Sequence, residues 1–384
     1  MEALIQTIDI LTLAAGALIS YLLLRIILHV AYKRQLFDYI DGRKVHNISV
    51  PRLGGIAFVP TIALVMIGIL GIATLRDAQP FLSNDVYELL LSLAALLFIY
   101  IEGMADDLMG VGYKLKFLCQ FLCAGIVISS GVCLTDFAGF LGLHAVSLWT
   151  AIPFTALLLV FIINALNLID GIDGLSSGLT ILSLLFFGLT FSYLGSYVYA
   201  ALSFAALGTV LPFFFFNVFG KAEHRKKIFM GDCGSQTLGL VLGILAVRLS
   251  MAPTPDNALI PTPLLISFSL MIVPCLDTIR VMFGRIRRHR GPFHPDKTHI
   301  HHKFLALGFS HRSAMLTILG IALAFDAVNY GLFLLAADFT LIVLADFLLW
   351  GVMHITLNHT MRRRGCINYF DELENGCKET QQKS

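Results

Sequence analysis

Long apolar stretches, repeated from one end of the chain to the other, constrain the fold of this protein more than any other feature. A membrane-crossing helix needs about 20 mostly apolar residues, and 57% of the 384 residues are hydrophobic while only 14% are charged. This composition excludes an ordinary soluble enzyme. Eleven stretches qualify as candidate spans, the sixth and seventh divided only by Gly195 and Ser196: 6–29, 54–75, 86–104, 117–134, 151–169, 175–194, 197–216, 234–250, 259–281, 313–334 and 336–357.

The apolar stretches are long enough to be helices. Every backbone polar group inside a bilayer needs a partner within the protein, so only helices and closed barrels cross membranes. The sequence therefore predicts an all-α polytopic membrane protein, a bundle of about 11 transmembrane helices. We expect one transmembrane domain over 1–357 and a polar cytoplasmic tail over 358–384. The loops expected to carry the chemistry are 30–53, 105–116, 167–175, 217–234 and 282–312.

The distribution of Lys and Arg predicts the orientation. Nearly all of the 27 basic residues fall in the tail and in every second loop, whereas the loops at 76–85, 135–150 and 251–258 are almost free of them, Arg76 excepted. Basic loops stay in the cytoplasm by the positive-inside rule, which places the N-terminus outside and the C-terminus inside. Residues 1–9 contain acids but no Lys or Arg, so we expect no cleaved signal peptide there.

Residues 164–174 (NALNLIDGIDG) form a polar island inside a membrane-length apolar segment. Charge at membrane depth is costly and usually marks a site. If the island is helical, the three-residue spacing of Asn167, Asp170 and Asp173 places their side chains on roughly one face, where they can converge on one ligand. The alternative is a helix end capped by Asp and Gly. A site is the favoured interpretation, because further polar islands follow.

Two other islands contain carboxylates. Asp106 and Asp107 are adjacent (EGMADDLMGVGYKLK) and are followed by Lys114 and Lys116. Adjacent carboxylates repel each other, so an ionised pair suggests a nearby cation, although a solvated helix terminus would also explain it. The second island is FMGDCGS at 229–235, just before a span. Glycines around an acid before a helix N-terminus suit a phosphate or its metal ion.

The loop 285–312 contains HPDKTHIHHKF among many basic residues. A zinc site is one interpretation, but the surrounding cations oppose a divalent ion. A solvated basic loop that attracts lipid headgroups is a second. We favour a third, a clamp of Arg and His donors on a polyphosphate. With the acidic islands, this loop indicates a metal-dependent phosphoryl-transfer site at one membrane face. A transporter would place its polar groups near the midplane.

The motifs, in this order and spacing, resemble those of the polyprenyl-phosphate N-acetylhexosamine-1-phosphate transferases, the superfamily of WecA, TagO and MraY. The resemblance spans roughly residues 40–310, and the last two spans and the tail carry no motif of that superfamily. The similar segments are KVHNISVPRLGGIAF, MADDLMG, NALNLIDGIDGLSSG, FMGDCGSQTLG and HPDKTHIHHKF.

The resemblance implies an enzyme. It would transfer N-acetylglucosamine 1-phosphate, or a related N-acetylhexosamine 1-phosphate, from the UDP-sugar to undecaprenyl phosphate with release of UMP. The cofactor would be Mg²⁺, for which Mn²⁺ can substitute. This would be the first membrane step of a cell-envelope glycan such as O-antigen lipopolysaccharide or teichoic acid, at the cytoplasmic face of the bacterial inner membrane. The expected partners are the UDP-sugar, undecaprenyl phosphate and the bilayer; no nucleic acid is expected, and a homodimer is left open.

The resemblance also assigns residue roles. By motif position the metal ligands would be Asn167 and Asp232. The catalytic residues beside the phosphates would be Asp106, Asp107, Asp170 and Lys116, with Lys114 as an alternative to the last. The substrate-binding residues would be Asp173, Phe229, Arg52, His299, His301 and His302, of which the first two hold the uridine.

One departure bears on the donor sugar. The histidine segment continues HIHHKFLALGF, with no Glu after Phe, whereas MraY typically has one there. The segment is closer to the WecA/TagO type, which favours a small donor such as UDP-GlcNAc. Transfer of phospho-MurNAc-pentapeptide, or a donor such as UDP-FucNAc or UDP-QuiNAc, remains an alternative within the superfamily. A lipid-phosphate-binding or transport protein without turnover is the non-enzyme alternative.

Overall fold

The computed structural model describes residues 2–36, 50–75, 85–291 and 297–366. Parts of the predicted loops 30–53, 76–85 and 282–312, and most of the tail 358–384, lie outside the described residues. The helices, in chain order, are α1 (Glu2–Arg34), η1 (Gly54–Ala57), α2 (Phe58–Leu75), α3 (Asp85–Met109), α4 (Tyr113–Ser129), η3 (Phe140–Gly142), α5 (Leu148–Ile169), α6 (Leu175–Tyr193), α7 (Tyr197–Val218), η4 (Ala222–His224), α8 (Gly231–Ser250), α9 (Pro263–Leu270), α10 (Ile272–Arg287), α11 (Ile300–Ala306), α12 (His311–Leu334) and α13 (Phe339–Arg363).

The predicted all-α membrane architecture is confirmed for the described residues. Nine helices are long and apolar enough to cross a membrane, and a bent pair makes a tenth candidate. The only extended pairing in this part of the chain is an isolated bridge between Asp136 and Ala145. Each predicted span corresponds to a helix or bent pair, but α4 has only 17 residues. The count of eleven spans therefore stays a prediction.

The predicted span 259–281 is not a single straight helix. It consists of α9 and α10, which meet at Met271 with a bend of 61°. The last part, α10, continues to Arg287 and has arginines in its final turn. The apolar stretch alone did not indicate this bend. The narrow break predicted around Gly195 is confirmed, because α6 ends at Tyr193 and α7 begins at Tyr197.

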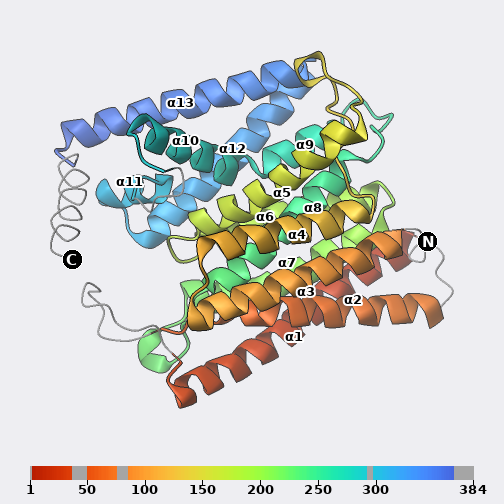
Figure 1. The fold of residues 1–384 in the computed structure, drawn as a ribbon, viewed down its shortest axis with the longest axis vertical. Coiled ribbons are helices and arrows are strands. Elements are labelled where there is room, and N and C mark those ends of the chain that lie inside the picture. Colours follow the sequence, from red (N-terminus) through yellow and green to blue (C-terminus); the bar gives the residue numbers. More distant parts are fainter. Residues whose placement is uncertain (1, 37–49, 76–84, 292–296, 367–384) are drawn as a thin grey trace.

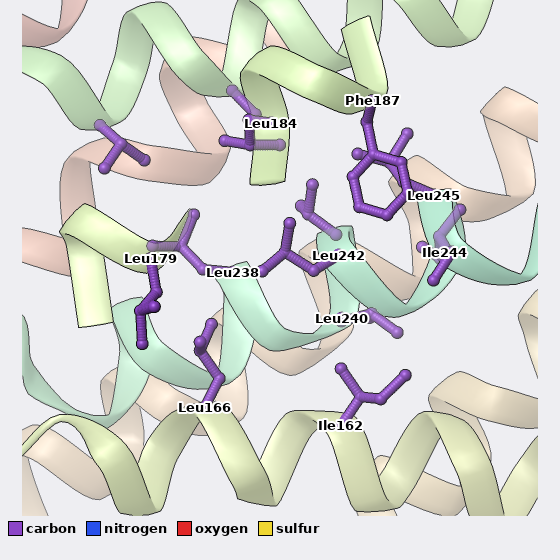
Figure 2. Packing of buried hydrophobic residues seen from close by; sticks show 14 of the residues in the cluster. Ile162, Leu166, Leu179, Leu184, Phe187, Leu238, Leu240, Leu242, Ile244 and Leu245 are labelled. Carbon is purple, nitrogen blue, oxygen red and sulfur yellow. The ribbon is translucent and has the colours of Figure 1, made fainter. Parts of the chain in front are cut away.

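The core is centred on α7 and α8. In the apolar stretch of each candidate span, the buried share is highest in α7 and α8, at 78% and 89%. In α1, α12 and α13 it is at most 28%. Leu238 and Leu242 of α8 face Leu166 of α5 and Leu179 of α6 in the packed interior (Figure 2). The peripheral helices are left with apolar outer faces, as expected for helices in contact with lipid.

The described residues of every predicted motif lie at one end of the bundle. Helices α3, α5, α7, α10 and α13 end there, and α8 and α12 begin there, on the left in Figure 1. We call this end the motif side. Short connections between antiparallel neighbours bring the island after α5 and the segment before α8 together there, although they are far apart in sequence.

Candidate active site

A cavity of about 900 Å³ opens on the motif side. Its lining comes from the segment before η1, the ends of α3, α5 and α7, the segment between α7 and α8, and the first turns of α8 and α12. The predicted site residues that line it are Arg52, Asp107, Asn167, Asp170, Asp173, Phe229 and Asp232. The charged or titratable groups not predicted are Lys221, Glu223, Lys227 and His311. The structure thus brings residues of four of the sequence motifs into one cavity.

One wall is built by backbone pairing between residues 51–55 and the segment before α8. The Phe229 amide donates to the Pro51 carbonyl at 2.9 Å, and the Gly54 and Gly55 amides donate to the carbonyls of Phe229 and Met230 at 2.9 and 2.8 Å. A Cβ on Gly55 would lie 2.1 Å from the backbone nitrogen of Gly234. Glycine therefore permits the close approach. The amides of these two glycines are used within the protein, and the contribution of this segment to the cavity is Arg52.

Asp107 fixes the start of α8. Its two carboxylate oxygens accept the backbone N–H groups of Asp232 and Cys233, at 2.7 and 3.0 Å. These N–H groups belong to the first turn of α8, where backbone donors have no partner within the helix. A carboxylate from α3 therefore satisfies the helix N-terminus that its own residues leave open, and it holds Asp232 at the cavity wall. Asp107 is thus a positioning residue in this structure.

Lys116 of α4 lies between two carboxylates. Its ammonium group pairs with Asp106, and it lies 2.6 Å from Oδ2 of Asp232. The second oxygen of Asp106 accepts the Val111 N–H at 2.6 Å. Asn167 donates to Oδ1 of Asp232 at 3.2 Å. Lys116, and not Lys114, therefore occupies the position between the carboxylates of α3 and α8.

The three-residue spacing had suggested that the island at 164–174 is helical throughout. Only its first part, within α5, is helical. Helix α5 ends at Ile169, Asp170 has a non-helical backbone, and Gly174 lies in the left-handed region at φ +79°. Asn217 of α7 accepts the Gly174 N–H at 2.7 Å, which fixes this turn. The expectation of one helix face is therefore wrong. Asn167 and the two aspartates nevertheless line the same cavity.

Asp170 lies between helices, in the most acidic part of the cavity. Burial raises the pKa of its carboxyl to about 7, and the negative charges of Asp232 and Asp173 raise it further, while Arg52 acts in the opposite direction. The cavity lining has five carboxylates against three Arg and Lys side chains. The charged side chains of the lining are therefore predominantly acidic.

Asp173 pairs with a lysine that the sequence motifs did not single out. The ammonium group of Lys227 lies 2.6 Å from Oδ2 of Asp173, and 5.8 Å from the centre of the Phe229 ring. Both charged side chains are 22% exposed. Lys227 belongs to a basic run directly before FMGD, so its proximity to the motif was the available signal. Charge alone did not distinguish it from the neighbouring Arg225 and Lys226.

The three predicted histidines lie beside the cavity and do not line it. His299 and His301 are buried, and the Nδ1 of His299 lies 2.9 Å from Oδ2 of Asp277 on α10. His301 packs on the turn after α5, where a Cβ on Gly171 would lie 2.1 Å from its ring. Its ring centre is 4.1 Å from that of His302. The structure brings this cluster against the island, but its direct contact with a phosphate stays a prediction.

Burial also changes the titration of the histidine helix α11. Burial lowers the pKa of His301 to about 3, and the neighbouring His302 and His299 contribute in the same direction. Lys303, the next basic residue, turns away toward α13, where its ammonium group lies 2.8 Å from Oδ1 of Asn358 and 3.1 Å from Nδ1 of His354. Burial, followed by the charge of Arg280, lowers the pKa of Lys303 to about 7. Lys303 therefore anchors α11 to the last helix.

The residues at the cavity fit a hard divalent cation. The polar groups around Asp232 that can coordinate a metal are carboxylate, amide and hydroxyl oxygens, from Asp232, Asn167 and Ser235. Mg²⁺ prefers oxygen ligands, and is commonly held by one or two carboxylates together with water and substrate phosphates. Among the described residues no group of three or more His, Cys, Asp or Glu side chains could hold a metal ion.

A multi-span helical bundle with a cavity at one end, lined largely by charged and polar side chains, defines a membrane-embedded protein with a polar site at one face. Residues 89–250 match the family described as glycosyl transferase family 4. The chain is 33% identical over 304 residues to the "Probable undecaprenyl-phosphate N-acetylglucosaminyl 1-phosphate transferase" of Bacillus subtilis (strain 168), which covers 78% of each chain. The protein therefore belongs to this family of membrane glycosyl transferases.

Two other relatives have similar identities, and one of them covers more of the chain. The "Decaprenyl-phosphate N-acetylglucosaminephosphotransferase" of Mycobacterium tuberculosis (strain ATCC 25618 / H37Rv) is 32% identical over 386 residues, covering 94% of this chain and 90% of its own. The "Undecaprenyl-phosphate alpha-N-acetylglucosaminyl 1-phosphate transferase" of Yersinia pestis is 31% identical over 299 residues, covering 75% and 74%. The superfamily resemblance of the sequence motifs is thereby confirmed.

Proposed function

We propose that this protein transfers N-acetylglucosamine 1-phosphate from UDP-GlcNAc to undecaprenyl phosphate and releases UMP. The observation that carries the proposal is the single cavity in which Asn167, Asp170 and Asp232 meet Phe229. This cavity joins groups suited to a metal-bound diphosphate with an aromatic ring suited to a base. The names of the relatives from Bacillus subtilis and Yersinia pestis support the same donor and acceptor.

In the proposed reaction, an oxygen of the acceptor phosphate attacks the β-phosphorus of the UDP-sugar. The bond between that phosphorus and the oxygen bridging to the α-phosphorus breaks, and UMP leaves. A phosphate monoester has a second pKa near 6 and is largely a dianion at neutral pH, so its attack does not require a general base. The main barrier is the repulsion between two anions, which positive groups and alignment reduce.

The side chains divide this work by position. Lys116 does not line the cavity, but its ammonium group contacts Asp232, which does, so it would reduce the negative charge that the incoming phosphate meets there. Asp107 would keep Asp232 in place through the first turn of α8. Mg²⁺ held by Asp232 and Asn167 would supply positive charge against the diphosphate.

The donor base would use a different part of the cavity. Asp173 would accept a hydrogen bond from uracil after its pairing with Lys227 opens, while Phe229 would stack on the ring. Lys227, once released, would remain close enough to the phosphates to contribute charge. The proposal therefore includes a local exchange of partners at Asp173 on donor binding.

A base role for Asp106 is held as a secondary hypothesis. Its carboxylate accepts from Lys116 and from the Val111 N–H, so it would have to release one donor to take a proton from a monoprotonated acceptor. The pH–rate profile of Asp106→Asn tests this role. An acidic limb identical to that of the wild type would exclude Asp106 as the base.

The deciding experiment is UMP release by purified protein with undecaprenyl phosphate, Mg²⁺ and either UDP-GlcNAc or UDP-MurNAc-pentapeptide. We expect turnover with UDP-GlcNAc, its loss with EDTA, and a decrease of about 10²- to 10³-fold for Asp232→Asn, since removal of a group that stabilises transferring charge has effects of this size. Asp136→Asn, in the exposed segment between α4 and α5, is the matched control and should retain activity.

Each contrary outcome selects one of the alternatives. Turnover only with the pentapeptide donor would assign MraY-type transfer. Turnover only with UDP-FucNAc or UDP-QuiNAc would assign a modified donor sugar. Binding of UDP-GlcNAc without release of UMP from any donor would support a lipid-phosphate-binding or transport protein and would overturn the proposed reaction.

We further propose that the motif side faces the cytoplasm of a bacterial inner membrane. The positive-inside rule supports this orientation, because the basic residues in the last turns of α1 and α10 and in the segment before α8 lie at this end of the bundle. A soluble UDP-sugar would then reach the cavity from the cytosol while the polyprenyl phosphate arrives through the bilayer.

A further inference from the structure

A second, larger cavity of about 1350 Å³ shares Gly220 with the active-site cavity. We call it the α1–α7 groove. It is lined by α1, by one face of α6, by the second half of α7 and the segment that follows it, and by Leu319 of α12. The sequence motifs do not predict this groove, and the reaction proposed above does not use it.

The two ends of the groove differ in chemistry. Away from the motif side its walls are apolar, with Leu182 of α6 and Pro212 and Phe215 of α7. Toward the motif side, six side chains that are positively charged or can become so enter the lining, and no carboxylate does: Arg25, His29, Lys33, His224, Arg225 and Lys226. An apolar channel with a basic end matches a ligand that has a hydrocarbon chain and an anionic head.

Helix α1 contributes a regular stripe to this groove. Tyr21, Arg25, His29 and Lys33 follow one another at intervals of four residues, so they share one face of the helix. Arg25 donates to the hydroxyl of Tyr21 at 2.9 Å, and the Tyr21 ring stacks on Phe216 at 5.8 Å. The stripe changes from aromatic to basic toward the motif side. Aromatic and basic side chains together are typical of the interface where lipid headgroups lie.

The segment after α7 separates the groove from the active site. Gly220 lines both cavities, Lys221 to Glu223 line the active-site cavity, and His224 to Lys226 line the groove. The chain then returns to the active site with Lys227 and Phe229. At its centre Arg225 has a left-handed backbone, φ +53°, and its guanidinium lies 5.8 Å from the centre of the Tyr32 ring. A ligand in the groove would therefore contact the segment 220–229 through His224 to Lys226, while Lys227 and Phe229 of the same segment line the active-site cavity.

We propose that the α1–α7 groove binds an anionic phospholipid of the bilayer, with its acyl chain along Leu182 and Pro212 and its headgroup at Arg25, Lys33 and Arg225. The polyprenyl phosphate acceptor is a poorer match, because its phosphate must approach Lys116 and Asp232, and neither of these lines the groove. The bound phospholipid stabilises the segment 220–229. The expected effect of this lipid on binding of the UDP-sugar rests on the proposed function. The binding of the lipid itself does not.

The test begins with lipid retention, measured by native mass spectrometry of the full chain released from phosphatidylcholine nanodiscs with and without phosphatidylglycerol. Wild-type protein should retain phosphatidylglycerol selectively. A basic side chain beside an anionic lipid contributes about a fivefold change in affinity, so Arg25→Gln with Lys33→Gln should reduce the selectivity by about 20- to 30-fold. Arg362→Gln with Arg363→Gln is the charge-matched control at the exposed end of α13 and should leave it unchanged.

A second variant tests the apolar half of the groove. Leu182→Trp fills the channel and leaves every basic side chain in place, so it should also reduce phosphatidylglycerol retention. Retention equal to that of the wild type in both the Arg25/Lys33 variant and Leu182→Trp would overturn the proposal. Undecaprenyl phosphate that is retained selectively by the wild type and the Arg362/Arg363 control, but lost in the Arg25/Lys33 variant and in Leu182→Trp, would assign the groove to the acceptor. That result would overturn the proposal as well.

The coupling to the active site has its own readout. With phosphatidylglycerol present, the KM for UDP-GlcNAc should fall in wild-type protein and stay constant in the Arg25/Lys33 variant, with kcat similar in both. If the KM for UDP-GlcNAc responds equally to phosphatidylglycerol in the wild type and in the Arg25/Lys33 variant, the proposed coupling between the groove and the active site is wrong. If the protein releases no UMP from any donor, the proposed function fails, but the retention measurement still decides whether the groove binds the lipid.

Discussion

At the scale of single residues, the arrangement around Lys116 is the clearest sign of how the site handles charge. One ammonium group is shared between Asp106, at the end of α3, and Asp232, in the first turn of α8. The Asp106 side chain is only 9% exposed, whereas that of Asp232 is 37% exposed, so the lysine matters most for the buried carboxylate of Asp106. The same positive charge lies where an incoming phosphate would have to arrive in the proposed reaction.

Replacement of this lysine tests that dual role. Lys116→Gln should lower kcat/KM by about 10²-fold or more, because it removes a positive group beside the reacting phosphates and leaves two carboxylates unneutralised. Lys116→Arg should retain part of the activity. The control is Lys114→Gln, an exposed lysine two residues earlier, which should behave like the wild type. Equal losses in the two glutamine variants, measured by UMP release, would contradict the assignment.

His301 gives a prediction about pH. Its pKa in the folded protein is lowered to about 3 from an ordinary value near 6.5, so between these values the unfolded chain binds a proton that the folded protein does not. Stability should therefore be lost as pH falls below about 6.5, at up to roughly 1.4 kcal/mol per pH unit from this group. Thermal unfolding in detergent at several pH values measures the slope, which His301→Gln should flatten. Parallel slopes for the two proteins would contradict it.

The sequence predicted the acidic residues of the site better than their partners. Asp170 and Asp232 stood out because charges in apolar segments are rare, and both line the cavity. Lys227 and Asn217 did not stand out, because a lysine in a basic run and an asparagine at a helix end have ordinary explanations. Their significance depends on tertiary contacts, with Asp173 and Gly174 respectively, and these contacts join segments distant in sequence.

At the scale of elements, the first turn of α8 is where the site is assembled. It receives a carboxylate cap from α3, backbone pairing from residues 51–55 and a side-chain contact from α5. Apolar length predicted the helices themselves, including the end of α5 at Ile169, but not the bend between α9 and α10 or the non-helical turn from Asp170 to Gly174. Both deviations involve breaks in the backbone, which the apolar pattern does not record.

The contact between η1 and α8 yields a prediction about packing. Gly55→Ala would place a methyl group 2.1 Å from the Gly234 nitrogen, and backbone atoms cannot turn aside as a side chain can. We expect a loss of about 1–3 kcal/mol in stability, typical of overpacking, and a larger loss of UMP release.

The matched control for this contact is Gly71→Ala, in the same region of the chain. A Cβ at Gly71 meets no atom within 4 Å, and alanine favours the helix, so this variant should be as stable as the wild type or slightly more so. Thermal unfolding and activity of both variants provide the measurement. Equal behaviour of the two would mean that the close approach at Gly55 is not required.

At the scale of the whole molecule, the bundle has two unlike ends. The motif side carries the active-site cavity and the basic end of the α1–α7 groove, and the opposite end carries the short segment around Asp136. The sequence predicted this polarity from charge distribution alone. It did not predict the groove, because its lining combines residues of four helices that have no common motif.

Thiol labelling can establish the orientation. In a background without reactive native cysteines, Asp136→Cys should react in intact cells with a membrane-impermeant maleimide. Glu223→Cys, exposed on the motif side, should react only after the membrane is permeabilised. The reverse pattern would invert the orientation, and with it the proposed access of the UDP-sugar from the cytosol.

The pairing of residues 51–55 with the segment before α8 also bears on how the protein is made. The ribosome delivers the chain from its N-terminus, so the earlier segment enters the membrane long before its partner is synthesised. Until α8 has been inserted, the cavity lacks a wall, Asp107 lacks the N–H groups it caps, and Asp232 is absent. An unfinished chain therefore cannot bind the donor, and the reaction becomes available only once the later helices have reached the bilayer.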